Sequence, residues 1–296
     1  MSKRLNDPSL FIRRSGPPDS RDVAVFLHGI ESHSGWFSRV MTLLATEGVH
    51  CLAFDRQGFG QSTGKRGHIS AVSACVREIN AIRQQVLDGQ SSTPPRFHLV
   101  GMSWGGLLAA YIGIKEPSLW SSVSLIAPAI FTIKMPPPKH LVQACFRPWL
   151  KVDLPITLQD FSLSPELQTE IERDPYRVTA VSMATLIHTA KLQASMRGGW
   201  TDRWRSKATP ASKLVPLQVL LSDRDTLIDS KRTATWARRL EIEVAWAYNS
   251  AHSLVLDCPQ WVADQLIAFI ARVSLRPATT PKTPPKTLVK QNPWAS

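Results

Sequence analysis

The fold of this chain is decided by the stretch Phe97-His98-Leu99-Val100-Gly101-Met102-Ser103-Trp104-Gly105-Gly106-Leu107-Leu108-Ala109-Ala110. An apolar run followed by Gly-x-Ser-x-Gly and small residues is typical of a nucleophile elbow, in which a strand turns sharply into a helix and exposes one serine hydroxyl. The exposed serine would be Ser103. Such a turn strains the backbone and crowds strand against helix, so a Cβ at Gly101 or Gly105 would clash.

Two simpler interpretations fit the same stretch. An ordinary glycine-rich turn is one of them, because the motif is short and its residues are common. A membrane span over residues 98–114 is the other, but this run is shorter than the roughly 20 residues a bilayer requires and contains His98 and Ser103. The elbow therefore needs support from a histidine base and an acid elsewhere, because a serine hydroxyl alone is a poor nucleophile.

The composition is that of a globular protein. Its 296 residues are 43% hydrophobic and 20% charged, which suits one large α/β domain with an insertion, or two small domains. Residues 1–8 lack the apolar core of a secretory signal, which predicts a cytoplasmic protein, at most peripheral at the membrane. Cys51, Cys75, Cys145 and Cys258 show no metal-ligand spacing and are expected to be free, buried thiols. Neither a metal nor a cofactor is implied.

The net charge of +12 lies partly in the C-terminal segment. Residues 273–296 hold four basic residues, five prolines and no acid, a composition that predicts a disordered tail. No nucleic-acid-binding motif accompanies this charge, so nucleic acid is not an expected partner. The charge predicts a weak association with an anionic membrane surface, and no obligate protein partner is implied.

Strand-like apolar runs alternate with helical patterns in the first half of the chain. The expected strands are 22–27, 49–54, the run before Gly101 and 121–127, and the expected helices are 36–46, 69–87 and one after Ser103. This order predicts a parallel sheet with right-handed crossovers, and the turn at 55–62 is expected to be scaffold. Ligands meet such sheets at the carboxyl ends of the strands, where Ser103 falls.

Residues 129–214, called the insertion below, interrupt this alternation. A helix is expected over 174–196, apolar on two faces that both need cover. A cap over the site with an acyl-chain pocket meets that need. The alternative is a second helical layer without a ligand role. The pattern then resumes with a strand at 216–221, an acidic loop at 222–229, a helix at 230–240, a strand at 242–248 and a closing helix from 259 to about 272.

Chain order selects the histidine. In folds that carry a nucleophile elbow on a parallel sheet, the catalytic residues follow the chain order nucleophile, acid, histidine. Only His252 follows the acidic loop at the end of a predicted strand. Asp223, Asp225 and Asp229 all remain candidates for the acid, because aspartates near a helix N-terminus also serve as caps.

The turn His28-Gly29-Ile30 follows the first predicted strand. An oxyanion-hole loop belongs at this place, with a backbone N–H, expected to be that of Ile30, directed at the reaction centre. His28 is expected to brace the loop, since only the backbone is needed for the chemistry.

Four segments resemble the monoacylglycerol lipase and lysophospholipase group of α/β-hydrolases. They are His28-Gly29-Ile30-Glu31-Ser32-His33-Ser34-Gly35, Asp55-Arg56-Gln57-Gly58-Phe59-Gly60-Gln61-Ser62, Gly101-Met102-Ser103-Trp104-Gly105-Gly106 and Arg173-Asp174-Pro175. The resemblance covers roughly residues 20–272. It implies an α/β-hydrolase fold with a mostly parallel central sheet, helices on both faces and an inserted helical cap.

The resemblance also implies roles for individual residues. Matched to the family's acidic loop, which reads Gly-x-x-Asp, the acid is Asp225, with Ser222 in place of the glycine. His252 matches the family's histidine, and the oxyanion donors fall on the backbone N–H groups of Ile30 and Trp104. Trp104 is bulkier than the family's usual residue, which is expected to narrow the pocket.

The implied organisation and function follow. Residues 1–21 form an N-terminal extension, 22–128 and 215–272 the two parts of the hydrolase core, 129–214 the cap, and 273–296 the basic tail. The implied enzyme is a serine hydrolase that cleaves a small hydrophobic ester, of the monoacylglycerol or lysophospholipid class, through an acyl-enzyme. A peptidase or amidase, an acyltransferase, and a non-catalytic ligand-binding scaffold are the alternatives.

Overall fold

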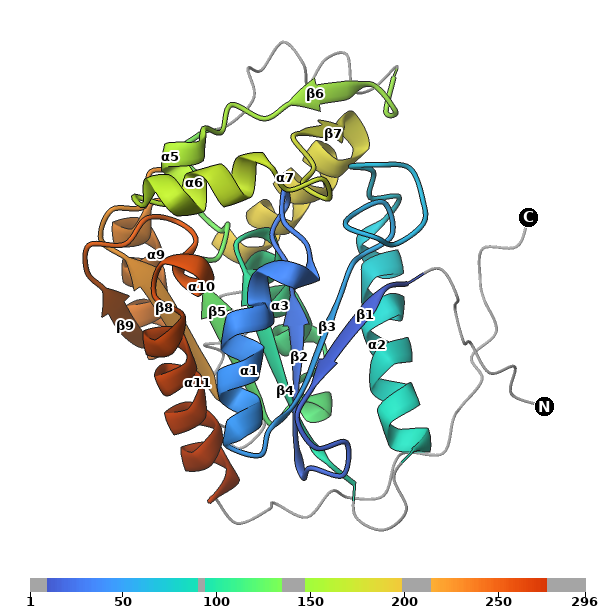
Figure 1. Cartoon of the computed structure of the whole chain (residues 1–296), viewed down its shortest axis with the longest axis vertical. Helices are drawn as coiled ribbons and strands as arrows, with labels where there is room; N and C mark the ends of the chain where they lie inside the picture. Colours follow the sequence, from blue (N-terminus) through green and yellow to red (C-terminus); the bar gives the residue numbers. More distant parts are fainter. Residues whose placement is uncertain (1–9, 90–93, 135–146, 199–213, 276–296) are drawn as a thin grey trace, which may run out of the picture.

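The computed structural model describes residues 10–89, 94–134, 147–198 and 214–275 and has a seven-stranded sheet at its centre (Figure 1). The strands are β1 (Ile12–Ser15), β2 (Asp22–Leu27), β3 (His50–Phe54), β4 (Arg96–Met102), β5 (Ser122–Ile126), β8 (Leu217–Ser222) and β9 (Glu243–Ala247). Their order is β1-β3-β2-β4-β5-β8-β9, and every neighbouring pair is parallel except β1 with β3. The predicted mostly parallel sheet is confirmed.

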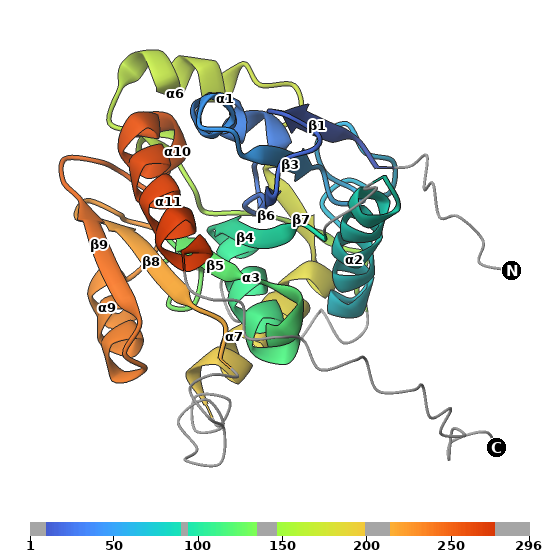
Figure 2. The same cartoon turned by 90° about the horizontal axis from the view of Figure 1, so that it is seen from below.

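Helices cover both faces of the sheet, as predicted. One face carries α1 (Ser38–Thr46) and α11 (Pro259–Ser274), and the other carries α2 (Val72–Asp88), α3 (Trp104–Lys115) and α9 (Ser230–Arg239) (Figure 2). The short helices η1 (Ser34–Phe37), η2 (Pro117–Leu119) and α10 (Leu254–Asp257) lie in the connections. Strands β3, β5 and β8 are buried along their whole length, which is why most of their residues are apolar rather than alternating with polar ones.

Strand β1 lies in a part of the chain where the sequence predicted no strand. It pairs antiparallel with β3, with Ile12 opposite Phe54 and Ser15 opposite Cys51. The strand forms the edge of the sheet and is only partly buried, so its sequence Ile-Arg-Arg-Ser shows no apolar alternation. Pairing with β3, rather than local pattern, makes this segment a strand.

The insertion lies beyond the carboxyl ends of the parallel strands (Figure 1). Its described elements are β6 (Lys151–Asp153), α5 (Leu158–Phe161), α6 (Pro165–Glu172), β7 (Ala180–Ser182) and α7 (Met183–Arg197). The predicted helix over 174–196 was wrong in its first nine residues, because β7 pairs with β6 and the Ser182 side chain caps α7 by accepting the Thr185 N–H.

The inward face of α7 also differs from the prediction. Thr185, Thr189 and Gln193 are buried on it, and each has a hydrogen-bond partner. The sequence predicted two apolar faces for this helix, but the apolar residues Ala190 and Ala194 are half-buried and exposed, respectively. Buried polar groups are tolerated where they are hydrogen-bonded, so this helix docks on the core through hydrogen bonds as well as apolar contact.

Cys51 and Cys75 are free and buried as expected, and Cys258 is half-buried. Cys145 and most of the basic tail lie outside the described residues, so the expected membrane association of the tail stays a prediction. Within the described ranges, no helix has both the length and the apolar character needed to cross a bilayer.

Candidate active site

Ser103 occupies the turn between β4 and α3, and its backbone is strained. Its φ of 55° and ψ of −117° are rare for a residue with a side chain. A Cβ on Gly101 would lie 2.3 Å from the Gly105 carbonyl oxygen, and one on Gly105 would lie 2.0 Å from that of Leu27. The strand-turn-helix geometry predicted for this stretch is confirmed, together with the reason for its two glycines.

Asp225 and His252 are hydrogen-bonded to each other. His252 Nδ1 lies 2.8 Å from Asp225 Oδ2, and both side chains are almost completely buried. Asp225 Oδ1 accepts the backbone N–H groups of Leu227 and Ile228, at 2.8 and 2.9 Å. An ionised carboxylate only accepts hydrogen bonds, so the proton lies on Nδ1 and leaves Nε2 as an acceptor.

The other two aspartates of the acidic loop have different surroundings. Asp229 caps α9 by accepting the Arg232 N–H at 2.9 Å, and Asp223 is exposed. The Ser222 hydroxyl, which stands where the resemblance expects glycine, donates to the Ser250 carbonyl and ties the acidic loop to the segment before His252. Of the three candidates, the structure brings Asp225 to the histidine.

Ser103, His252 and the loop after β2 line one small cavity. Its volume is about 20 Å³, close to that of a single water, and its lining comprises Gly29, Ile30, Glu31, Ser32, Trp36, Met102, Ser103, Ile156, Phe161, Leu227 and His252. Within the described part of the chain, the Ser103 hydroxyl makes no hydrogen bond. A Cβ placed on Gly29 would lie 3.3 Å from Ser103 Cβ, so the loop backbone is in contact with the elbow.

The two predicted oxyanion donors come from the loop after β2 and from the first residue of α3. Ile30 lines the cavity. Trp104 begins α3, so its N–H has no acceptor within the helix. The expected narrowing of the pocket by the Trp104 indole was wrong, because the indole points away from the cavity and its Nε1 donates to Thr189 Oγ1 at 2.8 Å.

The insertion reaches the site through α5. The Asp160 carboxylate accepts Lys134 Nζ and the Thr226 hydroxyl, and its backbone carbonyl accepts the His252 N–H at 3.2 Å. Phe161 packs its ring 6.4 Å from the His252 ring and lines the cavity. No motif in the sequence marked these residues, because they act only by contact with distant loops.

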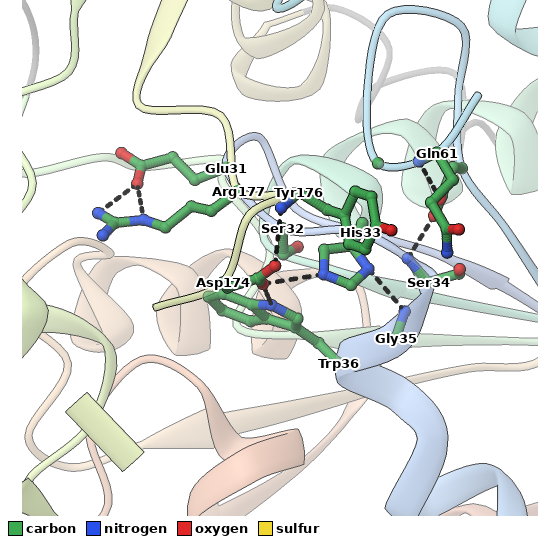
Figure 3. A network of polar contacts seen from close by, with 12 residues as sticks. Glu31, Ser32, His33, Ser34, Gly35, Trp36, Gln61, Asp174, Tyr176 and Arg177 are labelled. Carbon is green, nitrogen blue, oxygen red and sulfur yellow. Dashed lines mark hydrogen bonds and ion pairs between the residues drawn. The ribbon is translucent and has the colours of Figure 1, made fainter. Parts of the chain in front are cut away.

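A second set of contacts, called the clasp below, joins residues 31–36 to residues 174–178 of the insertion (Figure 3). Arg177 donates to the Glu31 carboxylate from Nε at 2.9 Å and Nη2 at 2.7 Å, and the Val178 N–H donates to the Glu31 carbonyl. Asp174 Oδ2 accepts His33 Nε2 and Trp36 Nε1, both at 2.9 Å.

The pKa values of the two carboxylates of the clasp are shifted in opposite directions. For Glu31 the loss of solvation outweighs the attraction of Arg177 and raises its pKa to about 7. For Asp174 burial acts in the same direction, but the hydrogen bonds from His33, Trp36 and the Tyr176 N–H prevail and lower its pKa to about 2. The clasp therefore has one carboxylate that titrates near neutrality and one that stays ionised there.

Comparison with known families and proteins shows what the chain is similar to. A family model described as "Serine aminopeptidase, S33" matches residues 18–259. A monoacylglycerol lipase of Mycolicibacterium smegmatis is 28% identical over 211 residues, which are 71% of this chain and 72% of that protein. A monoglyceride lipase of Mus musculus is 30% identical over 124 residues, which are 41% of this chain and 40% of that protein.

Solved structures share the fold at low sequence identity. The monoacylglycerol lipase of Paleococcus ferrophilus superposes with a TM-score of 0.70 at 21% identity, covering 89% of this chain and 98% of that one. A soluble variant of monoglyceride lipase from Saccharomyces cerevisiae, in complex with a substrate analog, gives 0.74 at 14% identity, covering 89% and 92%.

Proposed function

The chain belongs to the α/β-hydrolase family described as serine aminopeptidase S33, and from that premise we propose that it cleaves lipid-like carboxylic esters at Ser103. It is an ester hydrolase of the lipase and esterase type. The proposed substrate carries one acyl chain and belongs to the monoacylglycerol or lysophospholipid class. The relatives named as monoacylglycerol lipases, and one in Arabidopsis thaliana named as a probable lysophospholipase, support this class.

The proposed mechanism is acyl transfer to water through an acyl-enzyme. Ser103 Oγ attacks the ester carbonyl carbon while its proton passes to His252 Nε2, and the N–H groups of Ile30 and Trp104 stabilise the oxyanion. The carbon–oxygen bond to the alcohol then breaks, and the alcohol leaves with the proton from His252. Water attacks the acyl-enzyme in the same way and restores Ser103. Asp225 holds the imidazole in the tautomer with the proton on Nδ1 and stabilises its positive charge.

The observation that carries this proposal is the 2.8 Å hydrogen bond between His252 and Asp225 beside the strained Ser103, with Ser103 and His252 on one cavity. Met102, Ile156 and Leu227 contribute apolar surface to that cavity, which favours an acyl chain over a polar substituent. A cavity of about 20 Å³ cannot hold such a chain. We therefore propose that the insertion acts as a cap and moves to admit the substrate.

Covalent labelling tests the nucleophile. A fluorophosphonate probe should label the wild-type protein and the control variant Ser195→Ala. Ser195 is a suitable control because its hydroxyl donates to the Leu192 carbonyl of its own helix. The probe should not label Ser103→Ala, and this variant should have no activity on p-nitrophenyl butyrate. Labelling or turnover by Ser103→Ala would overturn the assignment. A scaffold without catalytic function would leave the wild type unlabelled as well.

Substrate profiling tests the class. Hydrolysis of monoacylglycerols and lysophosphatidylcholines of varied chain length should exceed hydrolysis of aminoacyl p-nitroanilides, with all substrates losing activity in Ser103→Ala. The reverse ranking would favour an aminopeptidase, in line with the family's printed description.

A further inference from the structure

Arg56 follows β3 and is completely buried, and no ion pair in the described ranges includes it, although the charges of Glu78 and Asp55 attract its guanidinium. Its guanidinium donates to two backbone carbonyls of the turn after β2, from Nη1 to His28 O at 2.5 Å and from Nη2 to Gly29 O at 2.7 Å. The same group lies over the Trp104 ring, 4.5 Å from its centroid. Arg56 thus contacts Gly29, which precedes the proposed oxyanion donor Ile30, and Trp104, which bears the second proposed donor.

The Gly29 carbonyl and the Ile30 N–H belong to one peptide unit. In a planar trans peptide these two groups point in opposite directions. Arg56, which bonds this carbonyl, does not line the cavity, whereas Ile30 and Ser103 do, so a trans peptide with its oxygen on Arg56 places the N–H on the cavity side. Rotating this peptide would break a charge-assisted hydrogen bond and point a carbonyl oxygen at the place where the oxyanion forms.

A second donor fixes the same carbonyl. His28 Nε2 accepts the Arg56 backbone N–H at 3.1 Å, so the ring proton is on Nδ1, which donates to Gly29 O at 2.8 Å. Burial, assisted by the positive charge of Arg56, keeps the pKa of His28 well below its usual value, so the ring is neutral. The structure thus agrees with the prediction that His28 braces the loop.

The two remaining backbone N–H groups of the turn differ in whether they have an acceptor. The Gly29 N–H donates to Ser32 Oγ at 2.8 Å. Within the part of the chain that the structure describes, the Ile30 N–H has no acceptor. It is therefore the group that the turn leaves available to a ligand.

From this geometry we propose that Arg56 is a positioning residue for the reaction at Ser103, which locks the Gly29–Ile30 peptide in the orientation an oxyanion hole requires. The inference rests on the proposed function. A cation on the carbonyl oxygen also polarises the peptide and strengthens its N–H as a donor. The turn at 55–62, which was expected to be scaffold, would thereby also act on the reaction site.

Arginine suits this position better than other residues. A buried charge that is in no ion pair is expensive even with the attraction of Glu78 and Asp55, so a purely structural role would favour a neutral residue. Burial lowers the pKa of Arg56 to about 10, which leaves it charged at neutral pH. Its planar fork spans two adjacent carbonyls, whereas the single nitrogen of lysine is a point charge.

The test compares Arg56→Met and Arg56→Lys with Arg83→Met, in full-length protein. Arg83 is a matched control because it also stacks on an aromatic ring, that of Phe97 at 5.0 Å, but lies on α2 and is not among the residues lining the cavity. Each variant is assayed on p-nitrophenyl butyrate and titrated with an alkyl trifluoromethyl ketone. Ser103 Oγ adds to the carbonyl carbon of this ketone, and the serine proton passes to His252. The former carbonyl oxygen becomes an oxyanion that lies in the oxyanion hole. An alkyl ether of similar shape serves as a ground-state ligand.

Arg56→Met should lower kcat by about 10²-fold with KM changed less than about threefold, because the lost stabilisation acts only on the oxyanion. Its affinity for the trifluoromethyl ketone should fall by a similar factor, and its affinity for the ether should not change. Arg56→Lys keeps the charge but cannot bond both carbonyls, so it should lose roughly tenfold in kcat and in ketone affinity. Arg83→Met should match the wild type.

If Arg56→Met does not fold, Arg56→Lys decides the question alone. Wild-type kcat and ketone affinity in a folded Arg56 variant would overturn the inference. So would an equal loss of ketone and ether affinity, because a general loosening of the site would then explain the effect. A wild-type protein that neither hydrolyses esters nor reacts with the ketone would instead refute the proposed function itself.

Discussion

Substitution of Asp225 by asparagine changes one atom at the buried pair with His252. Asp225 Oδ1 accepts two backbone N–H groups, from Leu227 and Ile228, while Oδ2 accepts His252 Nδ1–H. In Asp225→Asn the amide oxygen has to remain on the two N–H donors. The amide NH2 group then faces His252 Nδ1 and forces the ring proton onto Nε2. That tautomer cannot accept the proton of Ser103.

The size of the effect follows from these contacts. Turning the amide to restore the productive tautomer would break two buried hydrogen bonds, at a cost of about 2–3 kcal/mol, so roughly one molecule in a hundred would be competent. The neutral amide also cannot stabilise the imidazolium that forms in the transition state, which costs about another 10²-fold. We expect kcat to fall by about 10⁴-fold, equivalent to about 5.5 kcal/mol.

The assay is p-nitrophenyl butyrate hydrolysis with the melting temperature measured alongside. Asp223→Asn is the matched control, because Asp223 lies two residues away in the same loop and is exposed. The kcat of Asp223→Asn should lie within about twofold of the wild-type value, and its melting temperature should equal that of wild type. A folded Asp225→Asn protein with kcat within tenfold of wild type, or a larger loss in Asp223→Asn, would refute the role given to Asp225.

Three further substitutions test the packing around the site. Glu31 has a folded-state pKa of about 7, raised by burial above its ordinary value of 4.5, so its contribution to stability is complete below pH 4.5 and is lost as pH rises through 7. The free energy of unfolding of Glu31→Gln, measured in urea relative to that of wild type, should therefore rise by up to about 3 kcal/mol between pH 4.5 and pH 9. A difference between the two proteins that does not change with pH would contradict this. Asp174 has its pKa lowered to about 2, so its contribution is present above pH 3.8 and lost as pH falls through 2. The destabilisation by Asp174→Asn should accordingly shrink between pH 7 and pH 2 in thermal melts, and a constant deficit would exclude the clasp as its cause. Gly105→Ala places a Cβ 2.0 Å from the Leu27 carbonyl oxygen and should cost more than about 4 kcal/mol, whereas Gly48→Ala has nothing within 4 Å and should cost only about 1 kcal/mol, from its φ of 80°. Equal melting temperatures for these two variants would show that the elbow is not crowded.

Predictions from the sequence held where a pattern is local and were wrong where a contact is distant. Most residues of the strands before and after Ser103 are apolar because both faces of the sheet are covered. Strand β1 has no such pattern, because at the edge of the sheet its pairing with β3 decides its conformation. The helix predicted from residue 174 begins at Met183, because the pairing of β6 with β7 competes with helical propensity before it.

The sequence by itself determined the elbow at Ser103, because a strained turn needs glycines at set positions, and chain order left His252 as the histidine proposed to act as base. Only the tertiary structure decided which aspartate meets His252, that the insertion contacts the loop after β2 through the clasp, and that Arg56 holds the Gly29 carbonyl. These contacts join residues from 27 to 146 positions apart. Side chains so distant in sequence carry no shared periodicity, and their meeting depends on how the sheet, loops and insertion pack together.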